Sequence, residues 1–217
     1  MGLGSEAKTK LRVLSERKRH FLDSFVELTT GRNKGLFGVD FWMYAAINRS
    51  LSTIDAFCQL TKKRNYLAAF SLVRLHLDTL LRLYATTLVF DANGLVMRLM
   101  EGHQLRKEKD RQGKSMNDAY LVEKLQQDFQ LRWAKSVYEK TSGFIHLSQT
   151  HIYAPIWSTD DGERIANLVI SDASRYQPEF EIEAIDCMQE ITELLLTLIG
   201  QWSKQKPKIN HNNKFVK

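Results

Sequence analysis

Apolar side chains recur at every third or fourth position over two long stretches near the start of the chain. Residues 5–29 and 40–63 both show this spacing, which is typical of one face of an α-helix. Gly31 and Gly35 interrupt the pattern between them. We therefore predict two long helices whose buried faces carry Leu11, Leu14, Phe21, Phe25 and Leu28, and Phe41, Tyr44, Ile47, Leu51, Ile54, Phe57 and Leu60.

The most apolar stretch of the chain, residues 66–90, has apolar side chains on nearly every face. Such a pattern predicts the most buried helix of a domain, and Asn65 is a good cap for its start. Charged side chains such as Arg74 and Asp78 lie at its centre, which argues against a membrane span. Residues 1–20 are charged and contain no apolar run of the kind found in signal peptides. We therefore expect a cytoplasmic protein with no membrane partner.

Shorter helical patterns follow at residues 95–100, from about Asn117, and at 131–148. The segment 102–117 contains five basic and two acidic residues, and we predict a mobile connection there. A last helix is predicted over residues 179–203, with a buried stripe formed by Ile182, Ile185, Met188, Thr192, Leu195, Ile199 and Trp202.

The pattern changes to β-branched and aromatic residues at 151–157 and 164–171. Asp161 and Gly162 lie between these two runs, and Asp-Gly is a common hairpin turn. We predict a two-stranded hairpin that packs on the helices, because a pair of strands this small is marginally stable alone. The fold class is thus mainly α: a bundle of about five to six helices with one small β-hairpin.

The length of 217 residues favours one domain, and the 43% of hydrophobic residues suffices for a core. The net charge of +6 is concentrated at the ends: residues 203–217 contain five Lys and no acidic residue, and residues 1–20 contain six basic and two acidic residues. We predict a single helical domain over 1–203 and a basic, disordered tail over 204–217. The basic ends are either solvated termini or a binding surface for nucleic acid. Cys58 and Cys187 are expected to be buried thiols, with a disulfide left open.

Two groups of polar residues are candidates for a functional site. Arg74, Asp78 and Arg82 follow one another at intervals of four, so they form one stripe on the most apolar helix. This stripe is either a narrow solvent-facing strip or a cationic pair in a cleft, held by a carboxylate and suited to binding a phosphate or a carboxylate.

The second group consists of Tyr138, Ser142 and His146, which are again spaced by four residues and share one helical face. The imidazole of His146 could act as a general acid or base, and Lys140 could stabilise a developing negative charge. The alternative is a structural polar cluster at the end of a helix. No HExxH motif or Cys pair with zinc-ligand spacing is present, and no metal or other cofactor is expected.

The run Tyr138-x3-Ser142-x3-His146 resembles the signature of a bacterial all-helical family, which also carries an Arg and an acidic residue at a spacing of four, as Arg74 and Asp78 do. In layout the chain is similar to the HEPN superfamily of helical-bundle proteins, over roughly residues 40–148 and the last helix. Many HEPN proteins are metal-independent ribonucleases that use an Arg-x4–6-His motif, brought together in a dimer. Lys140 stands where that Arg would be, so the match departs from the motif at this point.

Three functions follow from these observations. The first is a HEPN-like binding or regulatory protein with a polar site of Arg74, Asp78 and His146. The second is a HEPN-like ribonuclease, as in a toxin or antiphage effector, with His146, Lys140, Ser142 and Tyr138 as catalytic residues and Arg74, Asp78 and Arg82 as ligand-binding residues. The third is a nucleic-acid-binding protein that acts through its basic ends. RNA, a nucleotide and a second copy of the chain are the expected partners, and whether the protein is an enzyme stays open.

Overall fold

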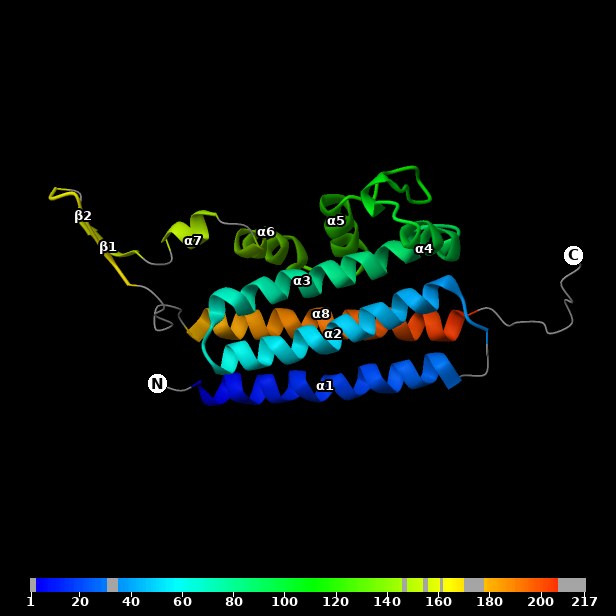
Figure 1. Ribbon diagram of the computed structural model, residues 1–217, viewed down its shortest axis with the longest axis horizontal. Helices are drawn as coiled ribbons and strands as arrows, with labels where there is room; N and C mark the ends of the chain where they lie inside the picture. The colour runs from blue at the N-terminus through cyan, green and yellow to red at the C-terminus, as the bar shows by residue number, and fades with distance from the viewer. Residues whose placement is uncertain are drawn as a thin grey trace, which may run out of the picture.

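The computed structural model describes residues 3–30, 35–145, 148–153, 156–160, 162–169 and 178–206. The mainly α fold with one small hairpin is confirmed (Figure 1). Over the described residues, the elements in chain order are α1 (Ser5–Thr30), α2 (Gly38–Lys62), α3 (Tyr66–Ala85), the 3-10 turn η1 (Thr86–Leu88), α4 (Ala92–Met100), the 3-10 turn η2 (Leu105–Lys107), α5 (Asp118–Asp128), α6 (Ala134–Ile145), α7 (Gln149–Tyr153), β1 (Ile156–Asp160), β2 (Ile165–Leu168) and α8 (Pro178–Gln205).

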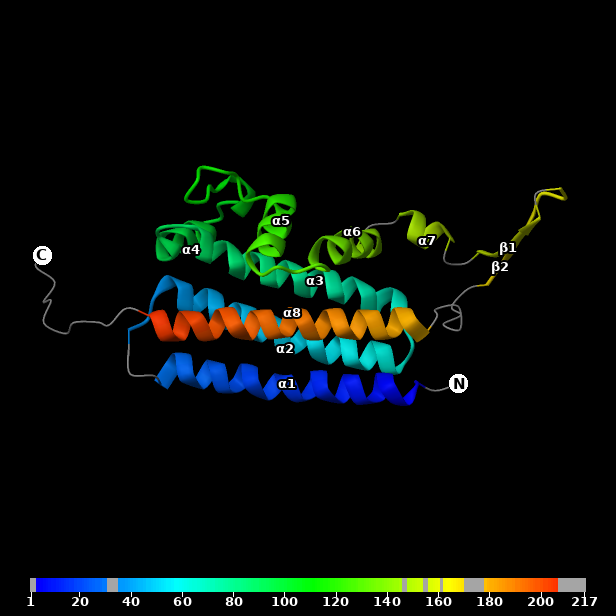
Figure 2. The ribbon, with the colours of Figure 1, turned by 180° about the vertical axis from the view of Figure 1, so that it is seen from behind.

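Four long helices, α1, α2, α3 and α8, form the body of the protein (Figures 1 and 2). α1, α2 and α3 follow one another up and down, whereas α8 runs in the same direction as both α1 and α3. Side-chain contacts show the parallel arrangement: Lys10 pairs with Asp186 near one end of the body, and Ser203 donates to Glu27 near the other. The last helix therefore reaches its place through a long crossover rather than a short turn.

α8 contributes a continuous row of buried side chains to the core of the body. Ile185, Met188, Thr192, Leu195 and Ile199 are all fully buried, which confirms the centre of the stripe predicted for the last helix. Two residues that were predicted to be buried are not: Phe25 of α1 and Phe41 of α2 are exposed. The apolar faces of α1 and α2 are wider than the surfaces of the helices packed against them. Part of each apolar face, including Phe25 and Phe41, is therefore exposed to solvent.

A buried ion pair joins the end of α8 to the start of α2. Asp40, fully buried in the first turn of α2, lies 2.8 Å from Nζ of Lys206, whose side chain is also buried. The other oxygen of Asp40 accepts a 2.8 Å hydrogen bond from Nε1 of Trp202. α8 extends to Gln205 and Lys206 is buried, so residues 204–206 of the predicted tail belong to the helical body, while 207–217 lie outside the described residues.

The segment predicted to be mobile, residues 102–117, is instead held in place. Asp110 accepts hydrogen bonds from the backbone N–H groups of Gln112 and Lys114 and from the hydroxyl of Tyr120 in α5. Leu105 and Met116 are buried in the core. The mobility prediction was wrong because one buried carboxylate satisfies the backbone donors of the loop, an effect that net composition does not reveal.

The hairpin is present but extends away from the helices (Figure 1). Its strands are antiparallel, with Asp160 opposite Ile165 and a bulge between Ile156 and Ser158. Every residue of β2 is exposed, so the prediction that the hairpin packs on the helices was wrong. The predicted first strand also begins later than expected, because residues 149–153 form α7.

Two further findings bear on the expectations from sequence. No helix in the described part of the chain is long and apolar enough to cross a membrane. Cys58 and Cys187 are free thiols, and burial raises the pKa of both, that of Cys187 to about 12. A disulfide between them is therefore excluded in this structure.

Candidate functional site

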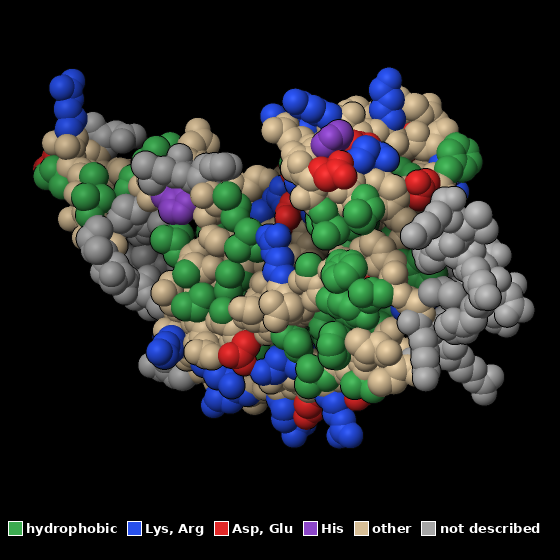
Figure 3. Space-filling view, turned by 45° about the vertical axis from the view of Figure 1, so that its right-hand side comes forward, with side chains coloured by type: hydrophobic (Ala, Val, Ile, Leu, Met, Phe, Trp, Pro, Cys, Tyr) green, Lys and Arg blue, Asp and Glu red, His purple; other side chains and the backbone are tan. Residues whose placement is uncertain are grey.

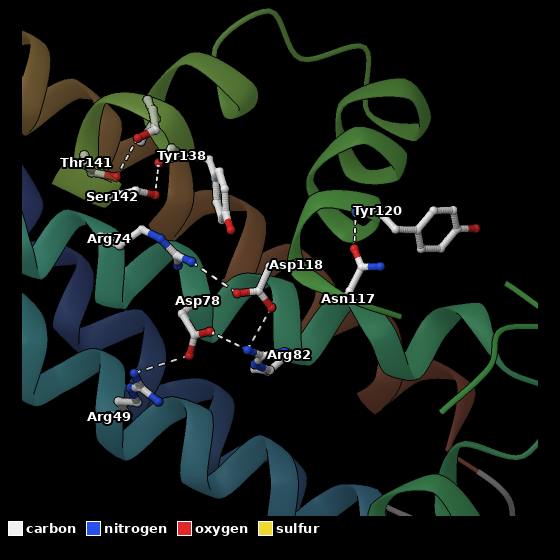
Figure 4. Close-up of polar contacts among 11 residues, drawn as sticks. Arg49, Arg74, Asp78, Arg82, Asn117, Asp118, Tyr120, Tyr138, Thr141 and Ser142 are labelled. Carbon is white, nitrogen blue, oxygen red and sulfur yellow. Dashed lines mark hydrogen bonds and ion pairs between the residues drawn. The ribbon is translucent and has the colours of Figure 1, made fainter. Parts of the chain in front are cut away.

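The charged stripe of α3 is part of a larger cluster that also includes α2 and α5 (Figure 4). Asp78 lies 3.0 Å from Arg82, which confirms the pairing predicted from their spacing. Arg74 instead pairs with Asp118, in the first turn of α5, at 3.2 Å. Asp118 also lies 2.9 Å from Arg82, and Arg49 of α2 lies 3.4 Å from Asp78. The five charges alternate in sign from Arg49 through Asp78, Arg82 and Asp118 to Arg74.

The cluster is half-buried. Only 12% of the Arg74 side chain is exposed, and Asp78, Arg82 and Asp118 are each between 20% and 30% exposed. A solvent-facing strip would leave these side chains largely free, so of the two interpretations of the stripe the structure favours the cleft. With three Arg and two Asp, the cluster retains one formal positive charge that its own carboxylates do not balance.

Local structure fixes the position of Asp118. The side chain of Asn117 caps α5 by accepting a 3.0 Å hydrogen bond from the backbone N–H of Tyr120. Asp118 therefore occupies the first position of the helix, where the positive end of the helix dipole favours a carboxylate. The sequence signals this helix start, but it does not reveal that the carboxylate bridges two Arg residues of α3.

Tyr138 and Ser142 of α6 lie beside this cluster, so two groups that are far apart in sequence meet (Figure 4). The guanidinium carbon of Arg74 lies 4.4 Å from the centre of the Tyr138 ring, which is a cation–π contact. The hydroxyl of Ser142 donates a 2.5 Å hydrogen bond to the carbonyl of Tyr138, within the helix.

A cavity of about 430 Å³ opens where these residues meet. Its lining comes from α3, α5 and α6: Arg74, Leu75, Asp78, Asp118, Tyr138, Ser142 and Ile145. Figure 3 shows the corresponding hollow, with positive and negative side chains at its floor. Arg82, a predicted ligand-binding residue, supports this site through Asp78 and Asp118 but is not among the lining residues.

Of the other two predicted catalytic residues, Lys140 does not line this cavity. Lys140 is on the side of α6 that faces α8, where its Nζ lies 2.7 Å from Glu183. There it borders a separate, largely apolar cavity of about 480 Å³ between α3, α6 and α8. His146 lies outside the described residues, so its position relative to Arg74 and Asp78 stays a prediction.

The basic residues near the start of the chain are mostly paired with acidic residues. Lys10 contacts Asp186, Arg17 contacts Glu193 and Lys18 contacts Asp55, at distances from 2.5 to 2.7 Å. These pairs attach α1 to α8 and α2, and they leave fewer unbalanced cations for a nucleic acid than the composition implies.

Within the described part of the chain, no group of three or more His, Cys, Asp or Glu side chains is arranged to hold a metal ion. Comparisons with protein families, with curated proteins and with solved structures find no match.

Proposed function

We propose that this protein is a HEPN-like helical-bundle binding protein whose α3–α5–α6 cavity binds an anionic small ligand, a nucleotide phosphate. The observation that carries the proposal is the convergence of Arg74, Tyr138 and Ser142 on one cavity, whose two carboxylates, Asp78 and Asp118, are each paired with two Arg side chains. The volume of about 430 Å³ lies within the range of small-molecule sites.

Arg74 is the residue that recognises the anion in this proposal. A guanidinium has five N–H donors, and Asp118 accepts from one nitrogen, Nη2, of Arg74. The Tyr138 ring and Asp118 together fix the orientation of the guanidinium, so less side-chain entropy is lost when a ligand binds. A planar guanidinium held in this way suits the paired oxygens of a phosphate.

The placement of Lys140 favours binding over catalysis. As a ribonuclease residue, Lys140 would have to face the phosphate, but its ammonium group contacts Glu183 on the other side of α6. The competing function is ribonuclease activity with His146 as general acid or base. The experiment must therefore measure cleavage as well as binding.

The test uses adenosine 5′-monophosphate and a short fluorescein-labelled single-stranded RNA as probes, without added metal. We expect Arg74→Gln to weaken binding of the monophosphate at least about tenfold, because a charge-assisted hydrogen bond contributes roughly 1.5–3 kcal/mol. Arg12→Gln, which changes an exposed Arg of α1, is the matched control and should bind as the unaltered chain does.

Calorimetry measures binding, and gel electrophoresis measures cleavage of the RNA. Equal affinity in Arg74→Gln and Arg12→Gln would show that the ligand binds elsewhere. Cleavage of the RNA that His146→Ala abolishes, while far-UV circular dichroism is unchanged, would replace the binding function with the ribonuclease function.

A further inference from the structure

The cavity of about 480 Å³ between α3, α6 and α8, which we call the α3–α6–α8 cavity, shares no lining residue with the α3–α5–α6 cavity. α6 and α8 lie on either side of α3 (Figures 1 and 2) and make few contacts with each other. Apolar side chains from all three helices line the cavity: Phe70 and Val73, Val137 and Phe144, and Phe180 and Ala184.

The polar groups that line this cavity already have partners. The hydroxyl of Thr141 donates a 2.5 Å hydrogen bond to the carbonyl of Val137, within α6. Nζ of Lys140 lies 2.7 Å from the carboxylate of Glu183, and both side chains are about half exposed, so this pair lies at the edge of the cavity. The thiol of Cys187 is neutral, because burial raises its pKa. The charges of the lining residues therefore sum to zero, and none of them is left unpaired.

Three aromatic rings suit the cavity to a flat apolar ligand. Phe70 and Phe144 pack edge to face, with ring centroids 5.1 Å apart and an angle of 77° between the ring planes. Rings that are already ordered lose little entropy when a ligand binds. Phe180 also lines the cavity, but 51% of this residue is exposed to water. A ligand in the cavity would cover the Phe180 ring, and contacts between aromatic rings are favourable beyond the area that they bury.

The volume of the cavity limits the size of the ligand. A dry apolar cavity of roughly 150 Å³ holds one molecule of benzene. At that ratio, a cavity of about 480 Å³ holds a molecule roughly three times the size of benzene. An aromatic compound of two or three rings has this size.

Two other kinds of ligand fit this lining less well. A fatty acid or another amphiphilic anion would need a free cation, but Lys140 already pairs with Glu183. A peptide would need hydrogen-bond partners for its backbone N–H and C=O groups, and a mostly apolar lining provides few of them.

We propose that the α3–α6–α8 cavity binds an uncharged aromatic molecule of two or three rings, at a site separate from the one proposed for a phosphate. Binding removes the rings of the ligand and of Phe180 from water, which is the driving force. An uncharged ligand avoids the cost of moving a charge from water into an apolar cavity.

Fluorescence titration of the full chain with N-phenyl-1-naphthylamine tests this proposal. The probe is uncharged, has three aromatic rings and emits more strongly in apolar surroundings, so we expect a saturable rise in emission. Phe180→Ala should raise the dissociation constant about tenfold, because one ring of the cavity wall is lost. Phe90→Ala is the matched control, since Phe90 is 88% exposed and lies outside the lining. Both residues are exposed, so both variants should retain their helical circular dichroism.

A second variant fills the cavity instead of removing part of its wall. Ala184→Phe places a ring within the α3–α6–α8 cavity and should abolish binding of the probe. Ala166→Phe, in the exposed strand β2, is its control. If Ala184→Phe loses its helical circular dichroism, the comparison of Phe180→Ala with Phe90→Ala decides.

The charge of the ligand is tested with 8-anilino-1-naphthalenesulfonate, which is the same probe with one sulfonate added. It should bind at least roughly tenfold more weakly, because an unpaired charge is costly in an apolar cavity. Adenosine 5′-monophosphate should not displace the uncharged probe, since its proposed site is the other cavity. A lack of saturable binding by the uncharged probe would overturn the proposal. So would equal dissociation constants in Phe180→Ala and Phe90→Ala, tighter binding of the sulfonate, or displacement by the monophosphate.

Discussion

His76 is a fully buried imidazole whose hydrogen bonds define its protonation. The hydroxyl of Thr192 donates to the carbonyl of Met188, so it accepts from Nε2 of His76 at 2.9 Å. The proton is thus on Nε2, and Nδ1 has no hydrogen-bond partner within the described structure. Burial, with a smaller contribution from the positive charge of Arg49, lowers the pKa of His76 from 6.5 to about 3.

This lowered pKa predicts an acid-sensitive core. The folded state excludes a proton that the unfolded state binds below pH 6.5, so stability falls as the pH drops from 6.5 towards 3. The slope is about 1.4 kcal/mol per pH unit for one proton. We expect His76→Leu to remove that slope, as measured by urea unfolding at pH 7, 6, 5 and 4. His103→Leu, at an exposed position, should keep it. Parallel curves for the unaltered chain and His76→Leu would contradict this account.

At this scale, the sequence predicts some of the candidate site. The spacing of four residues correctly predicts the contact between Asp78 and Arg82. It does not predict Arg49 or Asp118, because both pairs connect different helices and depend on how those helices pack. For the same reason, the spacing of residues on α6 does not predict that Tyr138 lies beside Arg74.

At the scale of the elements, a buried ion pair between Lys206 and Asp40 attaches the end of α8 to the start of α2. Removing one partner of a buried ion pair leaves the other charge without compensation, which costs about 3–5 kcal/mol. We expect Lys206→Met to lower the free energy of unfolding by about this amount, since Asp40 is fully buried. Urea unfolding measures the loss, and Lys204→Met, at an exposed position, is the control.

A second variant separates the charge from the packing of the side chain. Asp40→Asn/Lys206→Met removes both charges and keeps an amide oxygen that can accept from Trp202. We expect this double variant to be more stable than Lys206→Met alone. If it is less stable, the loss in the single variant comes from packing rather than from the unpaired carboxylate.

The presence of the long helices was more predictable than their surroundings, because the buried face of each helix repeats along the chain. The limits of the elements were predicted less well: α3 ends at Ala85 rather than at 90, and β1 begins at Ile156 rather than at 151. Periodicity assigned Lys204 and Lys206 to a tail, since Asp40, the partner of Lys206, is distant in sequence. Runs of β-branched and aromatic residues around an Asp-Gly turn also predicted the hairpin, but no local pattern shows which side of a hairpin, if any, packs on other elements.

On the scale of the whole molecule, α8 connects the other long helices. It contacts α1 through Lys10 and Asp186, α3 at Thr192 and α2 at Asp40, so we expect the four helices to unfold as one cooperative unit. We expect the unfolding transitions followed by tryptophan fluorescence and by circular dichroism at 222 nm to coincide. Ile185→Ala, at a fully buried position, should shift both equally by about 2–5 kcal/mol.

The exposed hairpin provides the comparison. Ile165→Ala changes a residue that no helix covers, so it should alter stability by less than about 0.5 kcal/mol. Two separate transitions, or a shift of only one of them in Ile185→Ala, would show that α8 unfolds independently of the other helices.

The parallel arrangement of α8 with α1 and α3 also has a consequence during protein synthesis. α1, α2 and α3 leave the ribosome first, with the groove that α8 fills still open to water. Until the last helix emerges, a nascent chain exposes apolar side chains such as Leu11 and Leu77, which are buried in the finished protein. The order of translation thus creates an interval in which chaperones, or neighbouring nascent chains, can bind this groove before α8 does.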